Sequence, residues 1–201
     1  MDILERVRTF GELHLRRAFT PLAHLFARVG ITPNQVSTAG FMLSIISAAL
    51  IVLDHWVAAA IVFLVASSFD LIDGTLARLD NQTTVFGKFL DSTLDRLSEG
   101  TVLAAIAYWF AQQGDAIPVA AVFLALLGGL LTSYTRARAE ALGASCKVGW
   151  VTRPERVLMI GIGLLFDVMS TAMYLLAALT LATALQRVLH VYKDLYTPSK
   201  D

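Results

Sequence analysis

The stretch DLIDGTLARLDNQTTVFGKFLDSTLD, residues 70–95, carries four aspartates inside otherwise apolar sequence. Asp70 and Asp73 end one apolar run, and Asp91 and Asp95 begin the next. An ionised carboxylate at membrane depth costs several kcal/mol unless a cation or hydrogen bonds offset the cost. The arrangement of these two acidic pairs therefore decides what kind of membrane protein the chain can be.

The composition of the whole chain indicates an integral membrane protein. Of its 201 residues, 56% are hydrophobic and only 16% are charged, and the mean hydropathy is +0.65. Soluble domains carry about a quarter of their residues as Asp, Glu, Lys and Arg. The 16 basic residues balance the 16 acidic ones, so no overall positive field favours nucleic acid as a partner. The single cysteine excludes an internal disulfide framework and a four-cysteine zinc site.

Apolar runs long enough to cross a bilayer predict the fold class: all-α, with six transmembrane helices in one domain over residues 1–201. No segment has the strand alternation that a transmembrane barrel needs. The six spans are predicted near residues 34–53, 55–79, 86–111, 117–142, 154–168 and 169–190.

Basic residues predict the orientation of these spans. They lie in the N-terminal stretch, near the second and fourth turns and at the C-terminal end, and the other turns have none. Both termini are therefore expected in the cytoplasm, in a multi-pass protein of the cell membrane. Apolar residues recur at helical spacing within residues 2–30, which predicts an amphipathic helix before the first span. This helix is expected to lie on the cytoplasmic membrane surface, to pack against the ends of the spans, or to do both.

The spacing of the acids predicts a site for divalent cations. Asp70 and Asp73 are three residues apart and Asp91 and Asp95 four, so each pair occupies one face of its helix. A short turn between the two helices can aim both faces at one point. Four carboxylates without His or Cys suit Mg²⁺, Mn²⁺ or Ca²⁺, and they can hold two ions. Two alternatives are a buried ion network with Lys88, Arg78 and Arg96, and a proton or ion pathway.

Small residues beside the acids favour the site for divalent cations. Gly74 follows Asp73, Ala77 lies one turn later, and Gly87 lies one turn before Asp91. They leave room for a bulky ligand to approach the backbone.

The pattern Asp70-x2-Asp73-Gly74-x2-Ala77-Arg78-x8-Gly87-x3-Asp91-x3-Asp95 resembles the signature of the CDP-alcohol phosphatidyltransferases at all eight of its positions. The resemblance implies that the phosphatidyl group of CDP-diacylglycerol moves to an alcohol with release of CMP. It implies that the four aspartates hold two ions, Mg²⁺ or Mn²⁺, and that Asp95 is the general base. It also implies that the CDP moiety meets Asn34, Ser37, Gly74, Arg78 and Thr84, and that the chain forms homodimers.

A second cluster of cations bears on the acceptor alcohol. Arg136 and Arg138 end the fourth predicted span, Lys147 follows, and Arg153 and Arg156 begin the fifth. Positive-inside bias explains part of such a cluster, but two arginines at a helix start oppose the helix dipole unless an anion lies between them. A phosphorylated polyol acceptor would supply that anion.

The residues 133–140 and 153–156 are similar to the corresponding runs of prokaryotic phosphatidylinositol-phosphate synthases in this family. The resemblance implies inositol phosphate as the acceptor, bound by Arg136, Arg153 and Arg156. Glycerol 3-phosphate as acceptor and an archaeal ether-lipid donor are the alternatives.

Three further features have weaker interpretations. Glu99 is expected either to support the metal ligands or to pair with Arg96. Cys146 is predicted in an exposed turn as an incidental free thiol. The pair Gly128–Gly129 predicts close helix packing, within the chain or between protomers.

Overall fold

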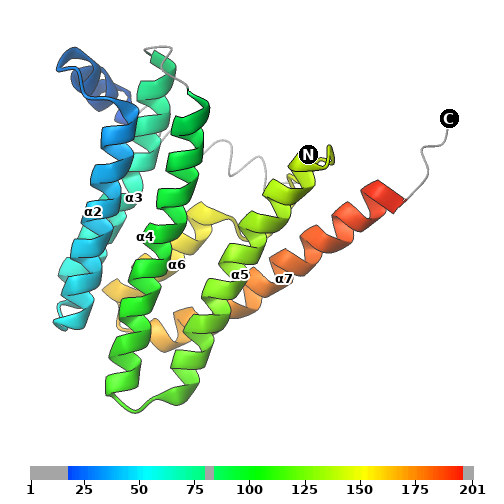
Figure 1. The fold of residues 1–201 in the computed structure, drawn as a ribbon. Coiled ribbons are helices and arrows are strands. Elements are labelled where there is room, and N and C mark those ends of the chain that lie inside the picture. Colours follow the sequence, from blue (N-terminus) through cyan, green and yellow to red (C-terminus); the bar gives the residue numbers. More distant parts are fainter. Residues whose placement is uncertain (1–17, 80–83, 197–201) are drawn as a thin grey trace. The chain divides into compact units, whose positions relative to one another are not determined.

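The computed structural model describes residues 18–79 and 84–196, which form helices and turns without any strand (Figure 1). Residues 18–28 form the first described helix. It is followed by α2 (Pro33–Val52), α3 (Trp56–Leu79), α4 (Val85–Gln112), α5 (Ala116–Ala141), α6 (Arg153–Leu165) and α7 (Met169–Tyr196). The predicted all-helical fold is confirmed for this part of the chain. Residues 1–17, where the predicted N-terminal helix begins, lie outside the described residues.

Four of the described helices are long and apolar enough to cross a membrane: α2, α3, α5 and α7. The helix α4 is also long, but charged residues from Lys88 to Glu99 interrupt its apolar sequence. The helix α6 has 13 residues, so at 1.5 Å per residue it is shorter than the roughly 30 Å of a hydrocarbon core. The chain is therefore a multi-pass membrane protein in which four helices meet the simple criteria for a span.

Tight turns join the helices where the sequence predicts them. Asp54 and Asp167 adopt positive φ angles of 64° and 55°. The indole nitrogens of Trp56 and Trp109 both donate hydrogen bonds to Asp54 Oδ1, at 2.7 Å and 3.0 Å. The two rings meet edge to face with centroids 4.7 Å apart. This contact joins the turn between α2 and α3 to the end of α4.

The contacts divide the chain into two compact units, and the first covers residues 18–46, 62–79 and 84–98 of the described chain. One core cluster of this unit consists of Ala23, Val36, Ile72 and Leu76. Phe19, Leu22 and Phe26, from the helix 18–28, pack against this core. The apolar face predicted from their spacing is therefore packed against α2 and α3, as one of the two interpretations of this helix expects.

The second unit covers residues 47–61 and 99–196, and within it α7 packs against both α5 and α6. Gly128 permits this close approach. A Cβ atom added there would lie 2.7 Å from Cβ of Thr180 and 2.9 Å from the backbone nitrogen of Leu181. Gly128 therefore serves helix packing within the chain, one of the two roles that the sequence leaves open.

Replacing Gly128 with alanine is expected to destabilise the protein, although alanine favours helices over glycine. The added methyl group would push α5 away from the backbone of α7, and such overpacking typically costs about 1–3 kcal/mol. The thermal unfolding midpoint of detergent-solubilised protein measures the effect.

Gly100→Ala is the matched control, because a Cβ atom at Gly100 would meet only Leu126 Cδ1, at 3.8 Å. Equal midpoints for Gly128→Ala and Gly100→Ala would show that the close packing of α5 on α7 at Gly128 does not contribute to the stability of the protein.

Candidate metal centre and adjoining pocket

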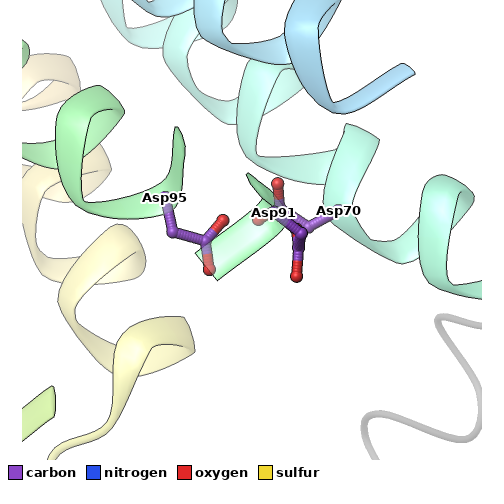
Figure 2. Close-up of side chains that lie close together, drawn as sticks. All are labelled: Asp70, Asp91 and Asp95. Carbon is purple, nitrogen blue, oxygen red and sulfur yellow. The ribbon is translucent and has the colours of Figure 1, made fainter. Parts of the chain in front are cut away.

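Three of the four predicted metal ligands converge in the first unit. Asp70 comes from α3, and Asp91 and Asp95 come from α4 (Figure 2). One carboxylate oxygen from each of the three lies within 4.8 Å of the others. All three side chains are partly buried. Hard oxygen ligands at this spacing suit Mg²⁺, Mn²⁺ or Ca²⁺, so the residues fit the predicted ion.

The start of α4 places two of these acids. Thr84 precedes the helix, and its hydroxyl oxygen accepts a hydrogen bond from the backbone N–H of Gly87 at 2.9 Å, as an N-cap residue does. Asp91 and Asp95 then follow one helical turn apart on one face. The guanidinium of Arg96 lies 3.7 Å from Asp95 and donates a hydrogen bond back to the Ser92 carbonyl.

The fourth predicted ligand, Asp73, is held differently. Its side chain is buried, with 5% of the residue exposed, and it accepts a hydrogen bond from the Ser37 hydroxyl of α2. The sequence suggests Ser37 only as a contact for the CDP moiety. The structure adds that Ser37 ties α2 to the acidic face of α3.

A pocket of about 330 Å³ adjoins the acids in the first unit. Its walls come from the start of α2, the end of α3 and the start of α4. The lining residues are Pro33, Asn34, Ser37, Asp73, Gly74, Ala77, Arg78, Thr84, Gly87, Lys88 and Asp91. All five residues predicted to meet a CDP moiety are among them.

Two glycines keep this pocket open. A Cβ atom at Gly87 would lie 2.9 Å from Thr84 Oγ1 and 3.1 Å from Asn34 Oδ1. At Gly74 it would meet only the Arg78 guanidinium, at 3.7 Å. Arg78 Nε donates to the Gly74 carbonyl at 2.8 Å, which sets the guanidinium beside the pocket. The predicted role of small residues beside the acids agrees with this geometry.

The three predicted acceptor arginines belong to the second unit, where their environments differ. Arg136 pairs with Glu140 at 2.9 Å, one helical turn away, and both side chains are half exposed. Arg153 is the first residue of α6 and is partly exposed. Arg156 is buried, with 3% of the residue exposed, and its guanidinium donates two hydrogen bonds to Glu99. The structure therefore pairs Glu99 with Arg156, where the sequence suggested Arg96 or the metal ligands.

Arg187 is a buried cation that the sequence interpretation missed. Its Nε donates to the Val148 carbonyl at 2.8 Å, and its Nη1 donates to the Thr132 carbonyl. Arg187 belongs to α7, so it ties both α5 and the segment between α5 and α6 to α7. The polar stripe Thr180, Thr183 and Arg187 at helical spacing in an apolar helix was the available signal.

The same segment contains Cys146, which is fully buried rather than exposed as predicted. Burial raises the pKa of the Cys146 thiol, and the charges of Arg187 and Arg136 oppose the shift only in part. The thiol therefore stays protonated at neutral pH, and a protonated thiol is a poor nucleophile. The exposed-turn prediction was wrong because it did not foresee that side chains of α7, Arg187 and His190, contact the backbone carbonyls of this segment.

Comparison with known proteins bears directly on this site. The family model described as CDP-alcohol phosphatidyltransferase matches residues 30–188. An archaetidylinositol phosphate synthase of Pyrococcus horikoshii is 36% identical over 194 residues, which cover 96% of this chain and 98% of the relative. A phosphatidylinositol phosphate synthase of Corynebacterium glutamicum is 35% identical over 183 residues, covering 87% of this chain and 84% of the relative.

Solved structures give the same result. A crystal structure of the Mycobacterium tuberculosis phosphatidylinositol phosphate synthase with CDP-DAG bound has a TM-score of 0.83 and 33% identity, covering 91% of this chain and 96% of that one. A second structure of that enzyme, in complex with manganese and citrate, has a TM-score of 0.81 at 33% identity and covers 90% of each chain. With the acidic cluster and its pocket, these matches show that the chain belongs to the CDP-alcohol phosphatidyltransferase family.

Proposed function

We propose that this enzyme transfers the phosphatidyl group of CDP-diacylglycerol to a hydroxyl of inositol phosphate and releases CMP. The observation that carries the proposal is the pocket of the first unit. It joins the five residues predicted for the CDP moiety to Asp73 and Asp91. Several relatives are named for the synthesis of inositol phosphate lipids, and one was solved with CDP-DAG bound.

In this proposal the CDP moiety occupies the pocket while the acyl chains stay in the bilayer. Asn34, Ser37 and Thr84 offer hydrogen-bonding groups, and Arg78 offers a cation to the phosphate oxygens. Gly74 lets the nucleotide approach the backbone, because the pocket side of this glycine holds only the Arg78 guanidinium.

The four aspartates would hold two divalent ions, Mg²⁺ or Mn²⁺. When bound, the ions supply positive charge that offsets the diphosphate and the charge gathering on the leaving CMP. Asp70, Asp91 and Asp95 bring their oxygens close enough for this task, and the Ser37 hydroxyl orients Asp73. The manganese in the solved relative supports a divalent ion in this family.

Asp95 would act as the general base. Its carboxylate takes the proton of the acceptor hydroxyl as the hydroxyl oxygen forms its bond to the lipid-linked phosphorus. The bond from that phosphorus to the oxygen of CMP breaks in the same displacement, and CMP leaves with the bonding electrons. The guanidinium of Arg96 lies 3.7 Å from this carboxylate.

The acceptor phosphate is assigned to Arg136, Arg153 and Arg156 of the second unit. An acceptor that carries a phosphate explains why cations gather at the start of α6, where the helix dipole disfavours them. Neutral acceptors such as inositol or serine would not need them. Glycerol 3-phosphate would, so it is the alternative acceptor.

The membrane arrangement completes the proposal. All six helices α2–α7 would cross or enter the membrane as one domain, with both termini and the active site on the cytoplasmic side of the cell membrane. The amphipathic helix predicted within residues 2–30 would lie at that surface, and two chains would form a homodimer. The basic residues of the turns support this orientation.

One observation favours a second donor. A relative that is aligned over 98% of its length is named as an archaetidylinositol phosphate synthase. An ether-linked CDP-lipid is therefore the second candidate donor, with the same site and the same acceptor.

The proposal is tested by CMP release from purified protein with CDP-diacylglycerol and Mg²⁺ or Mn²⁺. Inositol phosphate, glycerol 3-phosphate, inositol and serine are compared as acceptors. We expect release with inositol phosphate and loss of release on chelation with EDTA. Release with glycerol 3-phosphate alone would contradict the assigned acceptor. If CMP is released only from an ether-linked CDP-lipid, that lipid and not CDP-diacylglycerol is the donor.

Asp95→Asn is expected to keep the fold and lose turnover. The amide preserves the shape of the side chain but cannot accept the hydroxyl proton, and loss of a general base costs about 10²–10⁴-fold in rate. CMP release and the thermal unfolding midpoint are measured together. Asp115→Asn is the matched control, because Asp115 lies in the turn before α5 and makes no side-chain cap hydrogen bond. An active Asp95→Asn variant would rule out Asp95 as the base.

A further inference from the structure

Lys88 is a cation in the pocket of the first unit, and the proposed function gives it no role. It belongs to α4 and lines the pocket with Gly87 and Asp91 of the same helix and with the capping residue Thr84. The residues 84, 88 and 91 follow one another at helical spacing, so one face of α4 forms this wall. In the pattern Gly87-x3-Asp91 residue 88 is not fixed, so the lysine is a feature of this chain and not of the motif.

The charge of Lys88 has no partner within the described residues. Its side chain is exposed and forms no ion pair or hydrogen bond with any of them. Arg78, the other cation of the pocket, is held differently, because its Nε donates to the Gly74 carbonyl. Asp91, one turn from Lys88, converges with the other metal ligands. In the part of the chain that the structure describes, Lys88 is therefore outside the buried ion network that the sequence left as an alternative.

A cation is electrostatically disfavoured at the position of Lys88. It is the fourth residue of α4, and the first turn of this helix has no acidic residue. The N–H groups of a first turn give the helix end a partial positive charge, which repels a positive side chain. A bound anion beside Lys88 would remove this cost.

The pocket has an acidic end and a cationic end. Asp73 and Asp91 lie at the acidic end. Arg78 lies five residues after Asp73 on α3, and Lys88 lies three residues before Asp91 on α4. Because α3 and α4 run antiparallel, both steps lead in the same direction, away from the acids (Figure 1). A ligand that spans the pocket therefore meets the acidic cluster at one end and two cations at the other.

The opposite side of the same turn is apolar. Val85, Phe86 and Phe89 are exposed, and none of them lines the pocket. This side suits the lipid that surrounds a membrane protein, whereas Lys88 lies on the side of the helix that forms the pocket wall. The pocket is therefore the environment in which the charge of Lys88 acts.

We propose that Lys88 is a substrate-binding residue whose ammonium group binds the phosphate that stays on the nucleotide when CMP is formed. This inference rests on the proposed function, in which the reacting lipid-linked phosphorus lies near the base Asp95, at the acidic end. The phosphate next to the cytidine then lies toward the cationic end. Lys88 reaches it from α4 and Arg78 from α3, and each cation offers charge-assisted hydrogen bonds to its oxygens.

The test measures CMP binding to detergent-solubilised protein by isothermal titration calorimetry, with Mn²⁺ present. Lys88→Gln removes the charge but keeps a polar side chain, so it is expected to raise the Kd of CMP by about five- to tenfold. Lys88→Arg keeps the charge and should stay within about threefold of the wild type. Arg28→Gln is the matched control, because Arg28 is an exposed cation of the same unit outside the pocket.

Two further measurements isolate the phosphate contact. Cytidine lacks the phosphate, so it should bind the wild type and Lys88→Gln equally. The affinity for Mn²⁺ without nucleotide and the thermal unfolding midpoint should not fall in Lys88→Gln, because the side chain has no partner among the described residues.

A CMP Kd that Lys88→Gln leaves unchanged would overturn the proposal. An equal loss for cytidine would overturn it too, because Lys88 would then act on the shape of the pocket, and so would an equal loss in Arg28→Gln, because only overall charge would then matter. Weaker Mn²⁺ binding in Lys88→Gln would assign the lysine to the acidic cluster instead. A wild type that binds Mn²⁺ but no CMP would refute the proposed function and this inference with it. A wild type that binds CMP no better than Lys88→Gln does would refute only the role of Lys88.

Discussion

The mutual repulsion of carboxylates placed within apolar helices is the constraint on which this site depends. Asp70, Asp91 and Asp95 bring oxygens of like charge within 4.8 Å of one another, and no apolar packing can offset that repulsion. A divalent cation removes it and gains the oxygen ligands that it prefers. Neighbouring features hold these acids beside a pocket. Thr84 caps the start of α4, and the Ser37 hydroxyl donates a hydrogen bond to Asp73. Gly74 and Gly87 leave the pocket free of side chains at their positions.

The second unit handles its buried charges by pairing. Glu99 and Arg156 balance each other, and Arg187 is bound by backbone carbonyls of Val148 and Thr132. Such arrangements satisfy the charges and fix the helices in place.

The sequence predicted most of the fold because the apolar runs end abruptly. The predicted spans agree with α2, α3, α4 and α5 to within one residue at each end. The helix α7 continues to Tyr196, past the predicted end at residue 190, because its last turns are helical but too polar for a hydropathy pattern. The pocket residues could be predicted because one motif carries most of them. The partner of Glu99 and the burial of Cys146 could not, because each depends on a side chain that a different helix brings into place.

Counting the divalent ions that the purified protein binds tests the central claim most directly. Mn²⁺ is titrated into detergent-solubilised protein, and the free ion is followed by electron paramagnetic resonance. The site described above predicts two tightly bound ions per chain, and tight binding lost in Asp91→Asn but kept in Asp115→Asn. Mn²⁺ binding that is absent from the wild type, or that Asp91→Asn leaves unchanged, would contradict it.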